Sequence, residues 1–316
     1  MLENSFLNPL HTLRLISHEK HLNEFVKLYD KKLLPNALLL SGKKGIGKHT
    51  LINHFLNHIF NKGTETPYCL KKQLINKDSA FYNAVNNDLY TNIINFNAEL
   101  SNKVKIDDIR KLKLILSKTN LDTKPRFIII NEVEQLNLNC ANALLKILEE
   151  PTEKNYFILI NNNQSKILET ISSRCINHNI FLSPIHRKKI IENILEENSI
   201  KPVAELNLNM LTPGLYLEFN DILSKNNILL SKIIIETLSE LLMLYKKTKN
   251  SSIIILCSFI IEQHFHKLIM FNNKKINALI YLRNNIIKNF KDLVNYNLNI
   301  TSLLNSIEMK LKNVER

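Results

Sequence analysis

A glycine-rich turn follows a short apolar run near the start of this chain. Three of the five glycines, Gly42, Gly45 and Gly47, lie within six residues after the run 37–40, and Lys48 comes next. Such glycines let the backbone turn its amides onto phosphate oxygens, and the lysine adds a positive charge. The spacing therefore predicts a strand, a phosphate-binding loop (P-loop) and a helix. The alternative is a tight turn that holds no ligand.

One position departs from the P-loop pattern. The residue after the lysine is normally Ser or Thr and holds Mg²⁺, but here it is His49. Thr50 is a poor substitute, because one further residue on a helix turns the side chain by about 100°. We therefore place Gly42, Gly45, Gly47, Lys48 and Thr50 in a degenerate nucleotide loop. Whether this loop binds ATP without the metal stays open.

A second phosphate-site motif is also altered. The apolar run 126–130 is typical of a buried strand and ends in Asn131 and Glu132. A P-loop ATPase carries Asp and then Glu here, the first for the metal and the second to orient the attacking water. Asn131 removes a negative charge beside the metal. Glu132 has two interpretations, a retained water-positioning group or an acid at a helix start, where the helix dipole favours it.

Two longer motifs carry a resemblance to a known family. The segment 141–151 reads Ala-Asn-Ala-Leu-Leu-Lys-Ile-Leu-Glu-Glu-Pro, and Ser173, Arg174 and Cys175 follow about two dozen residues later. Together these motifs resemble the clamp-loader branch of AAA+ ATPases. The opening Asn-Pro, the lead-in 33–37 and the form of the P-loop are most similar to the delta-prime family of bacterial DNA polymerase III subunits. The resemblance covers residues 1 to about 215.

The resemblance implies a role for Arg174. In the family, the arginine of the Ser-Arg-Cys motif reaches into the ATP site of the neighbouring subunit, as an arginine finger supplied in trans. The planar, permanently charged guanidinium suits phosphate oxygens. The alternative is a cation at the end of a helix, which is mildly favourable for any chain.

Two further positions follow from the same comparison. Asn162 matches the polar residue that senses nucleotide in active relatives, although in a run of three asparagines it is equally well explained as a solvated loop residue. Leu215 stands after Pro213 and Gly214, where active relatives carry an arginine that contacts the nucleotide in cis. Without that arginine, a plain turn between helices is the preferred interpretation of Pro213 and Gly214.

The cysteines indicate neither disulfides nor a metal site. Cys69, Cys140, Cys175 and Cys257 are far apart, which fits a reducing cytoplasm. Many members of the family carry a four-cysteine zinc module after the P-loop helix, but only Cys69 lies in that region, and one thiol cannot form a tetrahedral site. We therefore expect no zinc, and no cofactor other than an uncertain ATP.

Targeting and charge add limits. The first eight residues do not form a signal peptide, and the longest apolar stretch, 253–261, is shorter than the ~20 residues of a membrane helix, so we expect a cytoplasmic chain without a membrane partner. The net charge of +13 is compatible with nucleic-acid binding. A lineage-wide preference for Lys, Asn and Ile explains most individual lysines equally well, and no basic motif with interleaved aromatic residues is present.

The expected organisation is α/β followed by all-α. Strands at about 37–41, 92–97, 127–131, 156–160 and 178–182 alternate with amphipathic helices, which predicts an AAA+ P-loop parallel sheet with helices on both faces. We divide the chain into a core at 1–182, a three-helix lid at 183–218 and a helical collar at 219–316, through which the family oligomerises. Helices are predicted at 228–245, 253–271, 276–290 and 300–311.

These features favour one function over two others. The first is an ATPase-inactive subunit of the DNA polymerase III clamp loader, which works with gamma/tau and delta subunits and, through the complex, with the sliding clamp and primed DNA. The resemblance implies membership of a nucleotidyltransferase holoenzyme and leaves uncertain whether this chain is itself an enzyme. The alternative is an active motor subunit of the gamma/tau kind. His49, Asn131 and Leu215 disfavour it, because each replaces a residue that contacts the metal or the nucleotide in active relatives. A replication initiator with a helix-turn-helix tail would not explain the Ser-Arg-Cys motif.

Overall fold

The computed structural model divides the chain into two compact units. It describes residues 8–87, 89–97, 104–117, 124–152, 154–203, 206–207, 210–230, 233–271 and 276–315. The first unit takes in residues 1–201 and 207–216, and the second takes in residues 202–206 and 217–316. The three-part division with borders after residues 182 and 218 stays a prediction.

The first unit is built on a parallel sheet. The described residues form five strands in the order β2-β3-β4-β1-β5. Their bounds are Ala37–Ser41 (β1), Ile93–Asn97 (β2), Arg126–Asn131 (β3), Asn155–Asn161 (β4) and Ile176–Asn179 (β5). Neighbouring strands run parallel throughout this order. Each pair is therefore joined by a crossover, and these crossovers carry the helices.

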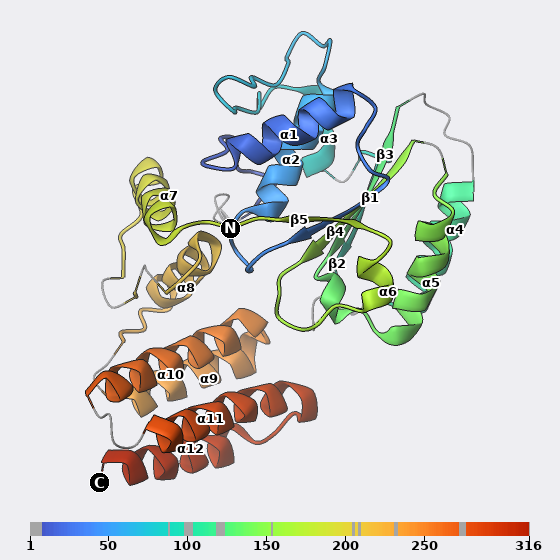
Figure 1. Ribbon diagram of the computed structural model, residues 1–316. Helices are drawn as coiled ribbons and strands as arrows, with labels where there is room; N and C mark the ends of the chain where they lie inside the picture. The colour runs from blue at the N-terminus through green and yellow to red at the C-terminus, as the bar shows by residue number, and fades with distance from the viewer. Residues whose placement is uncertain are drawn as a thin grey trace. The chain divides into compact units, whose positions relative to one another are not determined.

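Helices cover both faces of this sheet (Figure 1). One face packs against α1 (Glu19–Asp30), α2 (Lys48–Phe60) and α3 (Ala80–Asn86), and the other against α4 (Ile106–Ser117), α5 (Leu138–Glu149) and α6 (Glu169–Ser172). Successive side chains of a strand point to opposite faces. Phe127 and Ile129 therefore pack on the face covered by α1, α2 and α3, and Ile128 and Ile130 pack on the face covered by α4, α5 and α6. The predicted α/β class with helices on both faces is confirmed.

Four of the five strand predictions succeed, and the one for β5 fails. β1, β2, β3 and β4 begin and end within one residue of the predicted bounds. The strand predicted at 178–182 is wrong by two or three residues, since β5 pairs with β1 from Ile176 to Asn179. This edge strand is mostly exposed and polar, and the apolar residues that suggested a strand, 180–182, follow it.

The region predicted as a three-helix lid contains two helices among the described residues. Between β5 and residue 218 the described residues contain α7 (Pro184–Glu197) and the first part of α8 (Pro213–Lys225). The described residues between these two helices form turns and irregular backbone rather than a third helix. Ser183 begins α7 by accepting a hydrogen bond from the backbone N–H of His186 through its side chain, and proline at the first helical position suits such a start.

The second unit is a helical bundle. It contains α9 (Ile234–Thr248), α10 (Ser251–Phe271), α11 (Ile276–Tyr296) and α12 (Ile300–Glu315). Each of these helices packs against the next, and α12 returns to pack against α9. The predicted helices are therefore confirmed, with corrections at their ends. α9 spans Ile234–Thr248 rather than 228–245, α11 continues to Tyr296 rather than ending at 290, and α12 continues to Glu315 rather than ending at 311.

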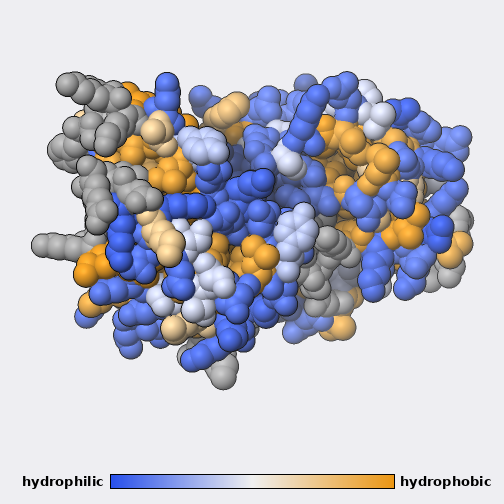
Figure 2. Space-filling model, turned by 90° about the horizontal axis from the view of Figure 1, so that it is seen from below, coloured by the Kyte–Doolittle hydropathy of each residue, from blue (hydrophilic) through white to orange (hydrophobic). Residues whose placement is uncertain are grey.

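Helix α10 is the most apolar element of the bundle. By length and composition, its residues Ser251–Met270 could cross a membrane, and 44% of that window is buried inside the protein. The apolar stretch is thus longer than the run 253–261 suggested. A central bundle helix has the same composition, and α10 packs against α9 and α11. In the view of Figure 2, hydrophobic patches alternate with hydrophilic residues.

Candidate functional site

The glycine-rich loop joins β1 to α2, as predicted. Gly45 and Gly47 have positive φ angles of 79° and 92°, a conformation that L residues with side chains rarely adopt. A Cβ atom on Gly42 would lie 2.6 Å from the Ile180 carbonyl oxygen. Each glycine of the motif is therefore required by the backbone. The loop has the shape of a phosphate cradle whether or not a phosphate binds there.

The lysine of the loop bonds to the loop itself. Lys48 Nζ donates to the carbonyl oxygen of Gly42 at 2.5 Å and to that of Lys43 at 3.0 Å. Its side chain is only 4% exposed. Burial lowers the Lys48 pKa to about 8, although the negative charges of Glu134 and Glu132 act to raise it. The charge that a P-loop directs at phosphate is held by backbone carbonyls in this structure.

A segment distant in sequence closes over the loop. Thr212 Oγ1 donates to the Lys44 carbonyl oxygen at 2.6 Å, and the Gly214 N–H donates to the Gly45 carbonyl oxygen at 2.8 Å. The contact is too tight for side chains, since a Cβ on Gly45 would lie 2.6 Å from Thr212 Oγ1 and one on Gly214 would lie 2.8 Å from Gly45 Cα. We call Thr212–Gly214 the clasp. Pro213 and Gly214 thus form more than the plain turn that the sequence suggested.

His18 supports the loop from its other side. It precedes α1 in a left-handed conformation, and its Nε2 atom lies 2.6 Å from the Ile46 carbonyl oxygen. Its ring also packs beside Gly47, since a Cβ added to this glycine would lie 3.3 Å from His18 Nε2. Burial is the main cause that lowers the His18 pKa. Neither His18 nor Thr212 was found by sequence reasoning, because both contacts join segments far apart in the chain.

The residues after β3 meet the loop and the residue after β4. Glu132 Oε1 accepts a hydrogen bond from Lys44 Nζ at 2.8 Å and one from Asn162 Nδ2 at 3.3 Å. The Asn162 N–H donates to Glu134 Oε1 at 2.9 Å. Asn162 is half-buried and bonds to both carboxylates that follow β3. Glu132 precedes a short 3-10 helix with a φ of 53°, and its carboxylate, 9% exposed, forms an ion pair with Lys44.

Desolvation also shifts the two remaining titratable groups of the site. Desolvation raises the Glu134 pKa, and its Oε2 atom has no hydrogen-bond partner among the described residues. His49, at the usual position of the magnesium ligand, has a pKa lowered by burial to about 4. It is therefore a neutral imidazole at neutral pH. Asn131 is half-buried at the end of β3, and Thr50 is half-buried two residues beyond Lys48 on α2.

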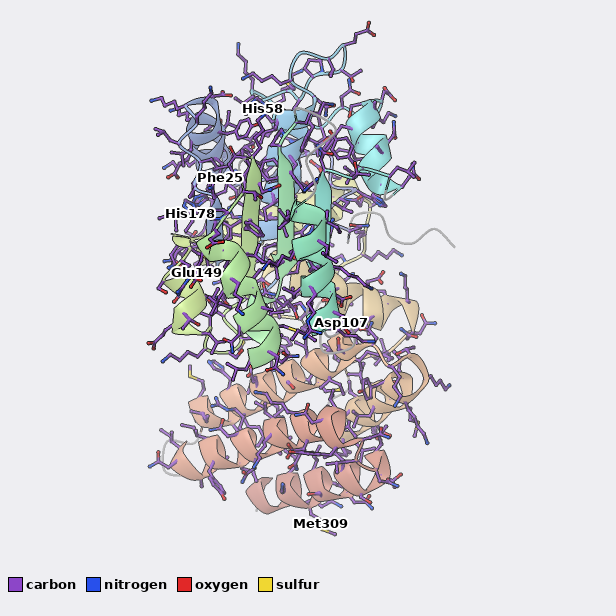
Figure 3. The ribbon with its side chains drawn as sticks, turned by 90° about the vertical axis from the view of Figure 1, so that its right-hand side faces the viewer. Phe25, His58, Asp107, Glu149, His178 and Met309 are labelled. Carbon is purple, nitrogen blue, oxygen red and sulfur yellow. The ribbon has the colours of Figure 1, made fainter. Side chains whose placement is uncertain are left out.

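Arg174 lies in different surroundings. It follows α6 and is exposed, with 35% of its side chain accessible. Its Nε and Nη2 atoms donate to Glu149 Oε1 at 2.9 and 2.5 Å, and Nη1 donates to the Thr170 carbonyl oxygen at 3.0 Å. Figure 3 labels Glu149 at the end of α5. The bond to the Thr170 carbonyl is one that a cation at the end of a helix makes. The exposure of the guanidinium is a feature that an arginine finger requires.

Cysteines take no part in this site. The four cysteines are free thiols, with Cys140, Cys175 and Cys257 buried and Cys69 half-buried. Cys69 pairs through its backbone with Leu74 in an isolated bridge. The expectation of no zinc rested on the positions of these thiols alone.

Comparison with known proteins identifies the family. A delta-prime subunit of DNA polymerase III from Buchnera aphidicola subsp. Schizaphis graminum is 29% identical over 200 residues, 61% of this chain and 58% of the relative. A gamma subunit from the same organism is 27% identical over 76% of this chain and 64% of its own length. A DNA polymerase III gamma subunit-related protein from Thermotoga maritima matches in structure over 93% of this chain and 99% of its own, with 16% identity and a TM-score of 0.49.

The match to the delta-prime relative leaves about two fifths of that relative's length uncovered. The family model described as DNA polymerase III, delta subunit, matches residues 17–182. That range takes in the P-loop, the residues after β3 and β4, and the Ser-Arg-Cys motif. The chain therefore belongs to the DNA polymerase III delta-subunit family, as the resemblance to delta-prime sequences predicted.

Proposed function

We propose that this chain is a delta-prime subunit of the DNA polymerase III clamp loader in the cytoplasm, which does not hydrolyse ATP itself. It lends Arg174 to the ATP site of a neighbouring subunit and helps the complex place the sliding clamp on primed DNA. In this proposal residues 1–182 form the AAA+ core, 183–218 the lid and 219–316 the collar through which subunits assemble. The family match over residues 17–182 and the similarity to a delta-prime subunit support the assignment.

The loop does not fit a magnesium nucleotide. Magnesium takes oxygen ligands in octahedral geometry, whereas His49 offers a neutral nitrogen and Asn131 offers no negative charge. The cations of the loop are engaged elsewhere, Lys48 with two backbone carbonyls and Lys44 with Glu132. We therefore assign no ATP hydrolysis to this loop, and the roles of Gly42, Gly47 and Thr50 are those of a scaffold.

The observation that carries the proposal is the exposure of Arg174. Its guanidinium lies at the surface between Glu149 and the end of α6. An exposed ion pair contributes little to stability. A phosphate of ATP bound to a neighbouring subunit can therefore replace Glu149 as the partner of Arg174 with little loss of stability. A guanidinium offers two parallel donors to phosphate oxygens, and a finger of this kind contributes about 10³ to 10⁵ in rate.

A groove between α4 and α5 supports a partnership with nucleic acid. Its volume is about 370 Å³, and it is lined by Arg110, Lys113 and Lys146 together with the amides of Asn139 and Asn142. Lys, Arg and Asn side chains are among the groups that form hydrogen bonds to the phosphate backbone. We propose this groove as the surface through which the chain meets primed DNA in the complex.

The similarity to a gamma subunit over 76% of this chain keeps one alternative, an active motor subunit. Co-purification with candidate gamma/tau and delta subunits, followed by ATPase assays with and without this chain, separates the two. We expect no turnover by this chain alone and a higher rate when it completes the complex. Turnover by the isolated chain that Lys48→Met abolishes would support the motor subunit instead.

A further inference from the structure

Two histidines and a carboxylate meet where α1 packs near β5. His21 and Glu24 lie three residues apart on α1, which places them on one face of the helix. His178 lies on β5, and its Nε2 atom is 2.8 Å from His21 Nδ1 although 157 residues separate them. The ligand atoms of His21, Glu24 and His178 all lie within 4.8 Å of one another. We call these three residues the His-Glu cluster.

Packing fixes the two imidazole rings. The rings of His21 and His178 meet edge to face with centroids 4.9 Å apart. Phe25, which is 2% exposed, packs its ring against His178 at the same centroid distance. Phe25 and His178 are labelled in Figure 3. Burial, with the neighbouring His178 as a second cause and Glu24 opposing it, lowers the His21 pKa.

We propose that His21, Glu24 and His178 bind one zinc ion, with water at the fourth position. Two imidazole nitrogens and one carboxylate oxygen form a known zinc ligand set. The absence of thiolate from the set favours zinc over the softer copper(I). This site differs in residue type from the four-cysteine module considered earlier, and it replaces the expectation of a chain without zinc.

Small movements suffice for this coordination. Zinc bonds of about 2.0–2.2 Å in a tetrahedron place ligand atoms about 3.3–3.5 Å apart. The two nitrogens, now 2.8 Å apart, must separate by about half an ångström for those bond lengths. Glu24 is exposed, so its carboxylate is able to close the remaining gap. For both nitrogens to bind the metal, the ring that now donates the hydrogen takes the tautomer with its hydrogen on its other nitrogen.

The metal would anchor α1 to the edge strand. His21 is three residues from His18, whose ring contacts the Ile46 carbonyl oxygen in the phosphate loop. Zinc at the His-Glu cluster thus fixes the helix that supports the loop from this side. Metal binding at this cluster does not depend on the proposed clamp-loader function.

Equilibrium dialysis of the full chain against zinc, with metal analysis of the protein, tests the site. We expect one zinc per chain, and a visible spectrum of tetrahedral cobalt when Co²⁺ replaces it. His21→Gln and His178→Gln should weaken binding at least about 100-fold, since loss of a mere second-shell partner already costs 10- to 100-fold. His11→Gln changes an exposed histidine outside the cluster and should bind as the wild type does.

Two further variants decide the remaining outcomes. Glu24→Gln alters an exposed side chain, so the protein should fold normally, bind zinc more weakly and lose the rise in melting temperature that zinc gives the wild type. Cys69→Ser should have no effect. The proposal is wrong if the wild type binds no zinc, if the cluster variants bind as tightly as the wild type, or if Cys69→Ser abolishes binding.

Discussion

The phosphate loop and the surface around Arg174 use their charges in opposite ways. In the loop, Lys48 and Lys44 bond to the chain's own carbonyls and carboxylate, and the clasp covers the backbone between them. On the other surface, Arg174 is exposed and its acidic partner, Glu149, is exposed as well. The same glycine and arginine motifs occur in active ATPases, but here one site is satisfied internally and the other is accessible.

This difference shows how a motif can keep its backbone and change its chemistry. Gly42, Gly45 and Gly47 are needed for close packing and positive φ angles, so their presence indicates fold rather than catalysis. An exposed arginine has no such requirement. Charge that faces outward is available to a partner, whereas charge bonded within the chain is not.

The largest expected effect concerns Arg174. In a reconstituted complex, Arg174→Ala should lower the rate of the one ATP site that it serves by about 10³, and total turnover by less, because other sites remain. Arg174→Lys should restore little, since a point charge does not reproduce the planar fork. ATPase rates of the complexes provide the measurement.

Arg14→Ala provides a matched control for Arg174. Arg14 is also an exposed arginine in an ion pair, with Glu197 at 3.2 Å. We expect this variant to keep the wild-type rate. If Arg174 only ends a helix, Arg174→Lys will behave as wild type, and Arg174→Ala will cost at most ~1 kcal/mol in stability with no change of rate.

The clasp predicts the next largest effect. Gly45→Ala forces a side chain into a positive φ and against Thr212 and the backbone of Leu215. Strain and overpacking together should lower the free energy of unfolding by about 4 kcal/mol. Gly63→Ala is the control, since Gly63 has a φ of +80° and nothing within 4 Å of the added atom. It should cost about 1 kcal/mol, and equal losses in urea denaturation would show that the clasp is not packed as described.

Much of the fold was predictable from the sequence, and the contacts of the site were not. β1, β3 and β4 are apolar runs buried on both faces, which local composition reveals. β5 carries Asn177, His178 and Asn179, and only its pairing with β1 makes it a strand. β2 lies at the other edge, but its residues Ile93, Ile94 and Phe96 are apolar and made it recognisable.

The same reasoning explains the result for the site. The glycines, Lys48 and Arg174 were found because their motifs are continuous in sequence. The Lys44–Glu132 pair joins residues 88 positions apart, and the bond from Thr212 to Lys44 spans 168. No local pattern encodes such contacts. Gly214 was the one available signal, because a glycine in the first turn of a helix often marks close packing.

Acid should lower the stability of the protein through the buried histidines of α2. Burial lowers the pKa of His54, on α2, from 6.5 to about 4, so the unfolded state binds more protons between these values. The free energy of unfolding should therefore fall as pH drops from 6.5 to 4, by about 3 kcal/mol for this residue. His49 adds to the effect in the same direction.

Urea denaturation at pH 7 and pH 5 measures this dependence. His54 is fully buried between Tyr68 and the Thr12 carbonyl, so His54→Gln should lower stability at pH 7 and flatten the pH dependence. A wild-type protein equally stable at both pH values would contradict the burial of neutral histidines on α2.

The smallest expected effect concerns the groove between α4 and α5. Lys113 and Lys146 are exposed and line it. If each contacts one phosphate, Lys113→Ala with Lys146→Ala should reduce the slope of log affinity against log salt by about 2 for primed DNA bound by the complex. Lys188→Ala changes an exposed lysine of α7 and should leave the slope unchanged. An unchanged slope in the double variant would remove the groove from the DNA surface.

The most direct test compares Lys48→Met and Arg174→Ala in the same reconstituted complex. With melting temperatures confirming that each variant is folded, the ATPase rate is measured with primed DNA and clamp present. The account predicts that Lys48→Met keeps the wild-type rate, because this loop turns over no ATP, whereas Arg174→Ala lowers it. A rate lowered by Lys48→Met and unaffected by Arg174→Ala would contradict the account.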